Sequence, residues 1–182
     1  MPNKIKVLVT GGAGYIGSCT SNILLDKGHD VTIIDNLTVG KIKLLPKKAK
    51  FHKFNIQNKK KLSNLLSKNN FDIVFHFAAF ISVEDSVNNP KKYLKNNFDN
   101  TKIFLEICRK FNLKNIIFSS TAAVYGDVKS FNANENFKKS PLNPYAISKL
   151  RVEEYLINSK FFRYIILRYF NVVGADLRLR SG

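Results

Sequence analysis

Three groups of residues in this sequence have types and spacings that could do chemistry. The first is Gly11, Gly14 and Gly17, in the segment GGAGYIG that directly follows a short apolar run. Glycines at this spacing between a strand and a helix permit a tight turn and bring backbone N–H groups close to a pyrophosphate. Asp35 follows 18 residues after Gly17, where a carboxylate binds an adenosine ribose and repels a 2′-phosphate. The pattern predicts a dinucleotide site that prefers NAD to NADP; a glycine turn without a ligand is the alternative.

The second group is Tyr145 and Lys149, four residues apart and therefore on one face of a predicted helix. A nearby ammonium group favours an ionised phenol, so the pair is expected to lower the pKa of Tyr145 from its ordinary value of about 10. Such a tyrosine can accept a proton from an alcohol. A packed tyrosine beside a solvated lysine is the alternative, which the preceding dinucleotide pattern makes less favoured.

The third group lies in SSTAAVYG, residues 119–126, at the end of a predicted strand. Ligands of doubly wound sheets bind beyond the carboxyl ends of the strands, so a hydroxyl there could bond to a reacting oxygen. A turn that only caps the strand is the alternative. The histidines and the two cysteines have no metal-ligand spacing, so we predict no metal site.

The elements that must position these groups alternate along the chain. Strands are expected at residues 5–10, 31–34, 50–56, 72–77, 115–120 and 164–168, and helices at 18–27, 59–67, 90–111 and 145–156. This alternation predicts an α/β fold, with a doubly wound parallel sheet of about six strands and helices on both faces. All three groups then lie at carboxyl ends of strands or at the beginnings of helices.

Composition excludes several classes of protein. The chain has 182 residues, of which 45% are hydrophobic, and this fraction argues against disorder. No apolar run approaches the ~20 residues of a membrane span, and no signal peptide is recognisable. The net charge of +17 raises the possibility of nucleic-acid binding, but the lysines are scattered and a compositional bias explains them. We expect no specific nucleic-acid partner, no membrane and, from only two cysteines, a cytoplasmic location.

Five segments in order resemble the extended short-chain dehydrogenase/reductase family, and within it the NAD-dependent epimerases of nucleotide sugars. They are TGGAGYIGS, HFAAFISVEDSV, SSTAAVYG, NPYAISK and LRYFNVVGA. The resemblance covers essentially the whole chain. It implies a Rossmann fold, NAD as cofactor, a UDP-sugar substrate and a homodimer formed by the helices at 90–111 and 145–156. The implied activity is 4-epimerisation of UDP-glucose and UDP-galactose through a transient 4-keto sugar.

The resemblance also implies roles for individual residues. Thr121 matches the catalytic hydroxyl, Tyr145 the base and Lys149 its partner. The implied cofactor-binding residues are Gly11, Gly14, Tyr15, Ile16, Gly17, Asp35, Asn36, Asn55, Ile56, Phe77, Ala78, Ala79, Asn97, Ser119, Tyr145, Lys149, Tyr169 and Phe170. The implied substrate-binding residues are Thr121, Tyr145 and Asn171.

The sequence departs from the family pattern at some positions. Asn55 stands where the family usually carries an aspartate that contacts adenine, and Ala122 and Ala123 replace the Asp-Glu pair of related dehydratases, which disfavours dehydration. Family members are much longer, so residues 1–182 are expected to be the NAD-binding domain, with the C-terminal substrate region largely absent. An epimerase or reductase of another nucleotide sugar, and a non-catalytic NAD-binding fragment with a partner chain, remain alternatives.

Overall fold

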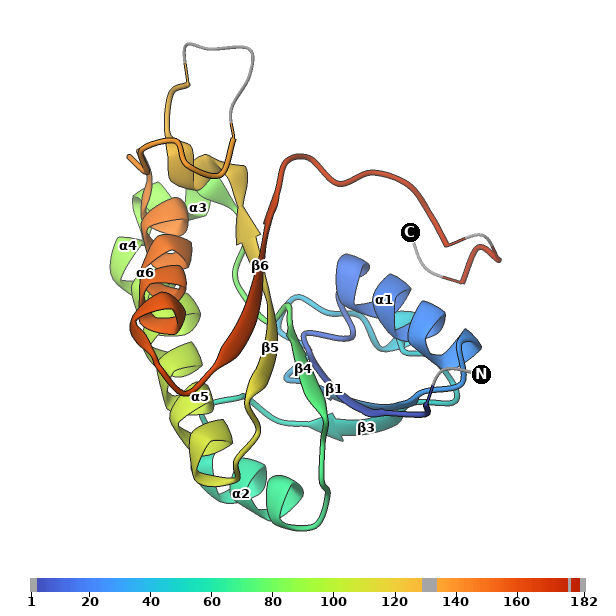
Figure 1. Cartoon of the computed structure of the whole chain (residues 1–182). Helices are drawn as coiled ribbons and strands as arrows, with labels where there is room; N and C mark the ends of the chain where they lie inside the picture. The colour runs from blue at the N-terminus through green and yellow to red at the C-terminus, as the bar shows by residue number, and fades with distance from the viewer. Residues whose placement is uncertain (1–2, 129–133, 177, 181–182) are drawn as a thin grey trace.

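A single parallel sheet forms the centre of the molecule, and helices cover it on both faces (Figure 1). The computed structural model describes residues 3–128, 134–176 and 178–180. Its strands are β1 (Lys6–Thr10), β2 (Asp30–Asp35), β3 (Lys50–Lys53), β4 (Ile73–His76), β5 (Asn115–Thr121) and β6 (Arg163–Tyr169). Their order, β3-β2-β1-β4-β5-β6, is that of doubly wound dinucleotide-binding folds. The predicted fold class is confirmed.

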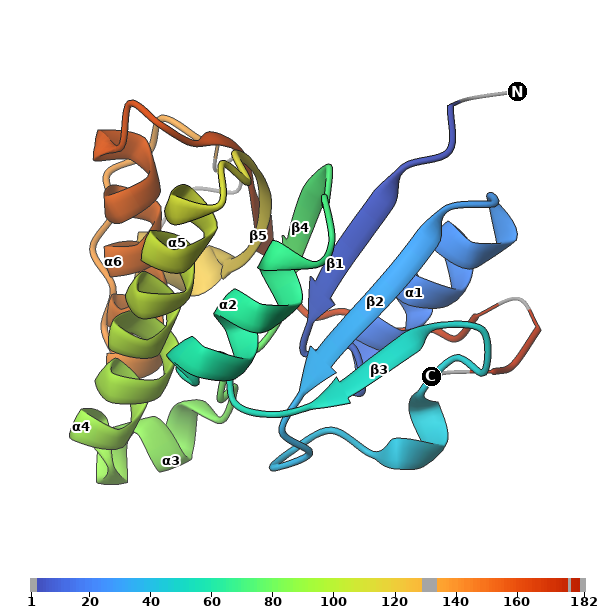
Figure 2. The ribbon, with the colours of Figure 1, turned by 90° about the horizontal axis from the view of Figure 1, so that it is seen from below.

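The helices divide between the two faces of the sheet (Figures 1 and 2). They are α1 (Tyr15–Asp26), α2 (Lys59–Ser67), α3 (Val83–Asn88), α4 (Pro90–Tyr93), α5 (Asn100–Lys110) and α6 (Pro144–Asn158). Short 3₁₀ turns lie at η1 (Ile42–Leu44) and η3 (Ala122–Tyr125), and a π-helical segment, η2 (Leu94–Asp99), joins α4 to α5. The helix α1 covers one face, and α2, α5 and α6 cover the other.

Both faces of the central strands are buried, which explains their uninterrupted apolar sequences. Successive side chains of β1 point to opposite faces. Val7 and Val9 pack with Ile33 in the core on the α1 side, whereas Leu8 packs with Val74 in the larger core beneath α2, α5 and α6. This packing holds the carboxyl ends of β1, β4 and β5 side by side, where the site lies.

Some boundaries differ from the sequence prediction for local reasons. β3 ends at Lys53 because Asn55 accepts a hydrogen bond from the backbone N–H of Gln57 and turns the chain. α3 was not predicted, although Ser82 accepts a hydrogen bond from the N–H of Asp85 and caps it. The Ser-x-x-Asp pattern is a signal that could have revealed this helix.

The predicted helix at 90–111 is helical throughout, but it is not a uniform α-helix. Four α-helical residues from Pro90 are followed by the wider turns of η2 before α5 begins. Periodicity in the sequence does not distinguish these forms, because both bury the same apolar side chains.

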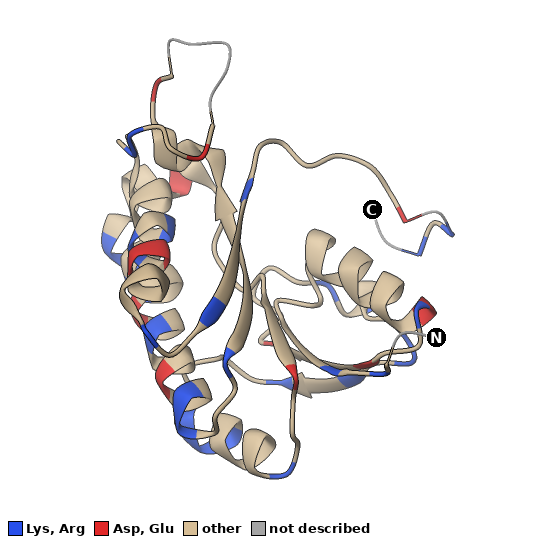
Figure 3. Cartoon of the chain, viewed as in Figure 1, with Lys and Arg blue, Asp and Glu red and all other residues tan. Residues whose placement is uncertain are grey.

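The basic residues are distributed over many elements, from α2 and α6 to the strands of the sheet (Figure 3). Within the part of the chain that the structure describes, no helix is both long and apolar enough to cross a membrane.

Candidate functional site

A cavity of about 610 Å³ lies at the carboxyl ends of the strands, and it brings the three predicted groups together. Its size is within the range of small-molecule sites, roughly 300–1,000 Å³. Of the residues predicted to bind cofactor or substrate, all except Asn97 line this cavity. They are Gly11, Gly14, Tyr15, Ile16, Gly17, Asp35, Asn36, Asn55, Ile56, Phe77, Ala78, Ala79, Ser119, Thr121, Tyr145, Lys149, Tyr169, Phe170 and Asn171.

Two glycines of the loop, Gly11 and Gly17, have no room for a side chain. Gly11 has a φ of +73°, and a Cβ there would lie 2.6 Å from the backbone nitrogen of Ala78. A Cβ on Gly17 would lie 2.3 Å from the carbonyl oxygen of Gly11. The loop therefore packs directly against the beginning of α1, whose first N–H groups have no partners within the helix and carry partial positive charge. This end of α1 suits a phosphate group.

Asp35 connects this loop to the end of β2. Its buried carboxylate accepts hydrogen bonds from the backbone N–H of Ala13 at 3.0 Å and of Leu37 at 2.8 Å. Two acceptor sites are thus used within the protein. A carboxylate offers about four, so Asp35 can still accept from ribose hydroxyls in the cavity, beside Asn36.

The opposite end of the cavity is formed by β5 and the first turns of α6. The side chain of Asn143 accepts a hydrogen bond from the N–H of Ala146 at 2.8 Å, and Pro144 occupies the first helical position, so α6 begins here. The Nζ of Lys149, only 3% exposed, donates to the carbonyl oxygen of Ser119 at 2.8 Å. It lies 6.0 Å from the centre of the Tyr145 ring.

The ionisation of this pair differs from the prediction. Burial raises the pKa of Tyr145 above its ordinary value, although a hydrogen bond with Thr121 acts in the opposite direction. Burial lowers the pKa of Lys149 to about 7. The expected lowering of the Tyr145 pKa by Lys149 is therefore wrong for this structure, because the amine is itself desolvated and is directed at a backbone carbonyl.

Asn97 requires a second correction, because it does not reach the cavity. It is buried, and its amide group donates to the carbonyl oxygen of Phe80 at 3.0 Å and to the hydroxyl of Ser148 at 3.1 Å. Its side-chain oxygen accepts from the N–H of Phe80 at 2.8 Å. The preceding residue, Asn96, lines the cavity instead. Asn97 thus holds Phe80, a wall residue, against α6.

The sequence reasoning missed several wall residues, mainly in loops. These are Ile34, Thr38, Val39, Gly40, Phe54, Phe80, Ile81, Val83, Asn96, Ser120, Ala122, Ala123 and Val172. Gly40 has a packing reason to be glycine, because a Cβ there would lie 2.9 Å from a carboxylate oxygen of Asp35. Except for Asn96, the others are apolar or small residues, and their residue types alone do not indicate a binding role.

The segment after β6 passes from the cavity toward α1 (Figure 1). The hydroxyl of Tyr15 donates to the carbonyl oxygen of Gly174 at 2.5 Å. Further along, Arg180 forms ion pairs with Asp26 of α1 and with Asp176, both at 2.7 Å. These contacts hold the segment after β6 against both ends of α1.

The residues present fit a dinucleotide. A glycine loop without room for a Cβ at Gly11 or Gly17, and a helix N-terminus, lie between a carboxylate at one end and the Tyr145–Lys149 pair at the other. Among the described residues, no three His, Cys, Asp or Glu side chains are grouped as a metal site would require.

Comparison with known proteins agrees with this geometry, since residues 7–181 match the NAD dependent epimerase/dehydratase family. This chain belongs to that family. It is 41% identical over 174 residues to the UDP-glucose 4-epimerase of Lacticaseibacillus casei, covering 94% of this chain and 53% of the relative. This member of the epimerase/dehydratase family therefore spans about half the length of the curated relatives it matches.

Solved structures of family members have the same fold. The UDP-glucose 4-epimerase of Brucella ovis in complex with NAD has a TM-score of 0.92 at 37% identity, covering 96% of this chain and 54% of the other. The enzyme of Bifidobacterium longum in complex with NAD⁺ and UDP has a TM-score of 0.91 at 35% identity, covering 97% and 56%. The described residues thus share the fold of these epimerase structures and cover a little over half of each of them.

Proposed function

We propose that this chain binds NAD in the cavity and belongs to an enzyme that interconverts UDP-glucose and UDP-galactose by 4-epimerisation. The observation that carries the proposal is that one cavity joins the glycine loop and Asp35 to Thr121, Tyr145 and Lys149. The similarity to UDP-glucose 4-epimerases, two of them solved with NAD, supports the choice of cofactor and substrate class.

The proposed cofactor site follows the order of residues along the cavity. The glycine loop and the beginning of α1 would hold the pyrophosphate, Asp35 and Asn36 the adenosine ribose, and Lys149 the nicotinamide ribose. When bound, the nicotinamide ring supplies a reversible acceptor of hydride.

The residues of the chain would then transfer the proton of the sugar C4 hydroxyl. Tyr145 takes the proton from the C4 hydroxyl of the sugar and returns it after the 4-keto sugar has turned over in the site. The hydroxyl of Thr121 stabilises the charge that develops on the sugar oxygen. Because burial raises the pKa of Tyr145, ionisation of the phenol needs positive charge nearby, and a protonated Lys149 is one source.

We further propose that residues 1–182 constitute the NAD-binding domain and that the sugar pocket needs additional chain. Phe170 is 78% exposed and Asn171 is also exposed, although both line the cavity. A partly open wall at this end also suits a non-catalytic NAD-binding chain that relies on a partner.

The assembly and cellular setting belong to the same proposal. A homodimer would pair the outer surfaces of α5 and α6, which lie side by side (Figures 1 and 2). A cytoplasmic enzyme of galactose metabolism is the setting that this activity implies. Light scattering during size-exclusion chromatography measures the assembly directly.

The test combines NAD binding with turnover. Calorimetry is expected to show NAD binding to the chain, and a coupled assay measures conversion of UDP-galactose to UDP-glucose. Tyr145→Phe should abolish turnover and leave NAD bound. Conversion of UDP-galactose by the unsubstituted 182-residue chain would refute the non-catalytic alternative. Unchanged activity in Tyr145→Phe would refute the role of Tyr145. Absence of NAD binding would refute the proposed function itself.

A further inference from the structure

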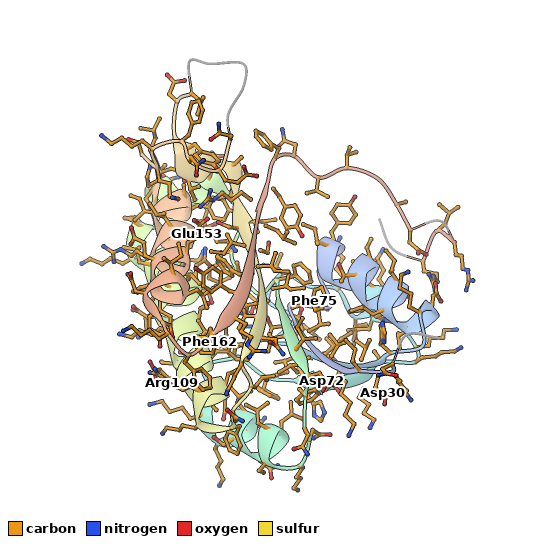
Figure 4. The ribbon with its side chains drawn as sticks, in the orientation of Figure 1. Asp30, Asp72, Phe75, Arg109, Glu153 and Phe162 are labelled. Atoms are coloured by element: carbon orange, nitrogen blue, oxygen red, sulfur yellow. The ribbon has the colours of Figure 1, made fainter. Side chains whose placement is uncertain are left out.

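A buried ion pair joins β6 to α6, the helix that carries Tyr145 and Lys149. Glu153, which extends from α6 (Figure 4), is 0% exposed, and its partner Arg168 on β6 has a side chain that is 14% exposed. A buried charge is costly unless it is paired and hydrogen-bonded. Replacing such a pair with apolar residues is often neutral for stability. Stability alone therefore does not account for the Glu153–Arg168 pair.

The pair is joined by a two-point fork. The Nε of Arg168 donates to both carboxylate oxygens of Glu153, at 3.0 and 3.2 Å, and a terminal guanidinium nitrogen donates to one of them at 2.7 Å. The other terminal nitrogen donates to the hydroxyl of Tyr125 at 2.6 Å. Forked contacts of this kind fix orientation as well as distance.

The carboxylate also reaches β5. The hydroxyl of Ser120 donates to Glu153, and Ser120 is the register partner of Arg168 in the parallel pairing of β5 with β6. Glu153 therefore contacts both strands at once. Tyr125, held by the same arginine, lies in η3, which begins directly after Thr121.

Two successive turns of α6 thus contact two successive residues of β5. Lys149 contacts the carbonyl of Ser119, and Glu153 contacts the hydroxyl of Ser120. Tyr145, Lys149 and Glu153 are spaced by four residues and share one helix face. The next residue of β5 is Thr121, so both contacts lie beside the residue that Tyr145 faces across the cavity.

We propose that Glu153 and Arg168 are positioning residues, which fix the rotation of α6 against the ends of β5 and β6 and thereby place Tyr145 and Lys149 relative to Thr121. The expected effect of this pair on turnover rests on the proposed function. The placement of the Tyr145 ring can be measured without it.

The experiment uses a charge-neutral double variant, Glu153→Leu with Arg168→Met. It removes one negative and one positive charge together, so the local net charge is unchanged and apolar packing is retained. A second variant, Arg168→Lys, keeps the positive charge and removes the fork. Glu106→Gln is the matched control, because Glu106 accepts from the hydroxyl of Tyr155 between α5 and α6, away from the cavity.

The first readout is the NMR signal of ¹³C-labelled tyrosine, assigned to Tyr145 by its loss in Tyr145→Phe. We expect the Tyr145 signal to shift or broaden in the double variant and in Arg168→Lys, and to stay unchanged in Glu106→Gln. Urea denaturation is expected to show that all variants fold. A wild-type Tyr145 signal in both site variants would overturn the proposal, as would an equal change in the control.

The second readout is binding and turnover. Where wild type is active, the variants should lose about 10²-fold in kcat with a smaller change in KM, the size expected for a misplacement near 1 Å. NAD affinity should fall together with the NMR change. If wild type fails to bind NAD, the proposed function fails while the NMR result still decides the positioning role. Wild-type kcat in the double variant would overturn that role.

Discussion

Acid is expected to destabilise this fold through one buried histidine. His76, at the end of β4, is almost fully buried and stacks between the rings of Phe104 and Phe118, 5.3 and 5.9 Å away between centroids. Its Nδ1 lies 2.7 Å from the hydroxyl of Thr10 and its Nε2 lies 3.0 Å from that of Thr101. Burial lowers the pKa of His76 from 6.5 to about 3, with a smaller effect from the charge of Lys149.

The sign and size of the effect follow from the two states of the chain. Above pH 6.5 the imidazole is neutral in both the folded and the unfolded chain, and its contribution is constant. Between pH 6.5 and about 3 the unfolded chain binds a proton that the folded chain does not. The free energy of unfolding therefore falls by about 1.4 kcal/mol per pH unit, or about 5 kcal/mol in total. That is a large part of the roughly 5–15 kcal/mol that stabilises a domain.

The assay measures the free energy of unfolding of wild type and of His76→Asn by urea denaturation at several pH values in this range. Circular dichroism monitors the unfolding. The variant should begin less stable, because it loses ring packing, so the slopes against pH are compared rather than the absolute values. By about pH 4.5 wild type should have lost about 3 kcal/mol more than the variant. A His52→Asn variant controls for the loss of a histidine on an outer strand. Equal slopes for wild type and His76→Asn would refute the reasoning, as would an NMR titration showing His76 protonated in the folded chain near pH 6.

Other predictions concern the loop, the ribose site and the core. Gly17→Ala should lower NAD affinity about tenfold or more, because its Cβ would lie 2.3 Å from the carbonyl oxygen of Gly11; calorimetry measures the affinity. Asp35→Ala should lower the free energy of unfolding by about 2 kcal/mol, measured in urea, because two backbone N–H groups lose their acceptor. Burial raises the pKa of the Cys108 thiol, so mass spectrometry should find it alkylated only as the chain unfolds.

Much of the site could be predicted from the sequence because its signals are local. The glycine loop, the end of β2 and the first turns of α6 each place their own residues by turn geometry, strand alternation or helix spacing. For this reason Gly17, Asp35, Tyr145 and Lys149 were recognisable before any contact between them was known, and all four line the cavity.

The prediction failed where a side chain had a choice of partners. Asn97 was expected at the cofactor, but the backbone of Phe80 and the hydroxyl of Ser148 take its amide group. The pKa of Tyr145 was expected to fall, but burial raises it. Neither outcome can be derived from spacing, because desolvation and hydrogen-bond competition depend on neighbours far away in the sequence.

The sequence by itself determined the fold class, the family and the groups able to do chemistry, because each depends on residues a few positions apart. Only the tertiary structure decided the strand order that places β5 between β4 and β6. It also decided the contacts of Lys149 with Ser119 and of Glu153 with Ser120 and Arg168. These contacts join α6 to β5 and β6, where the free energy of burying a charge, and not the spacing of the residues, selects the partner.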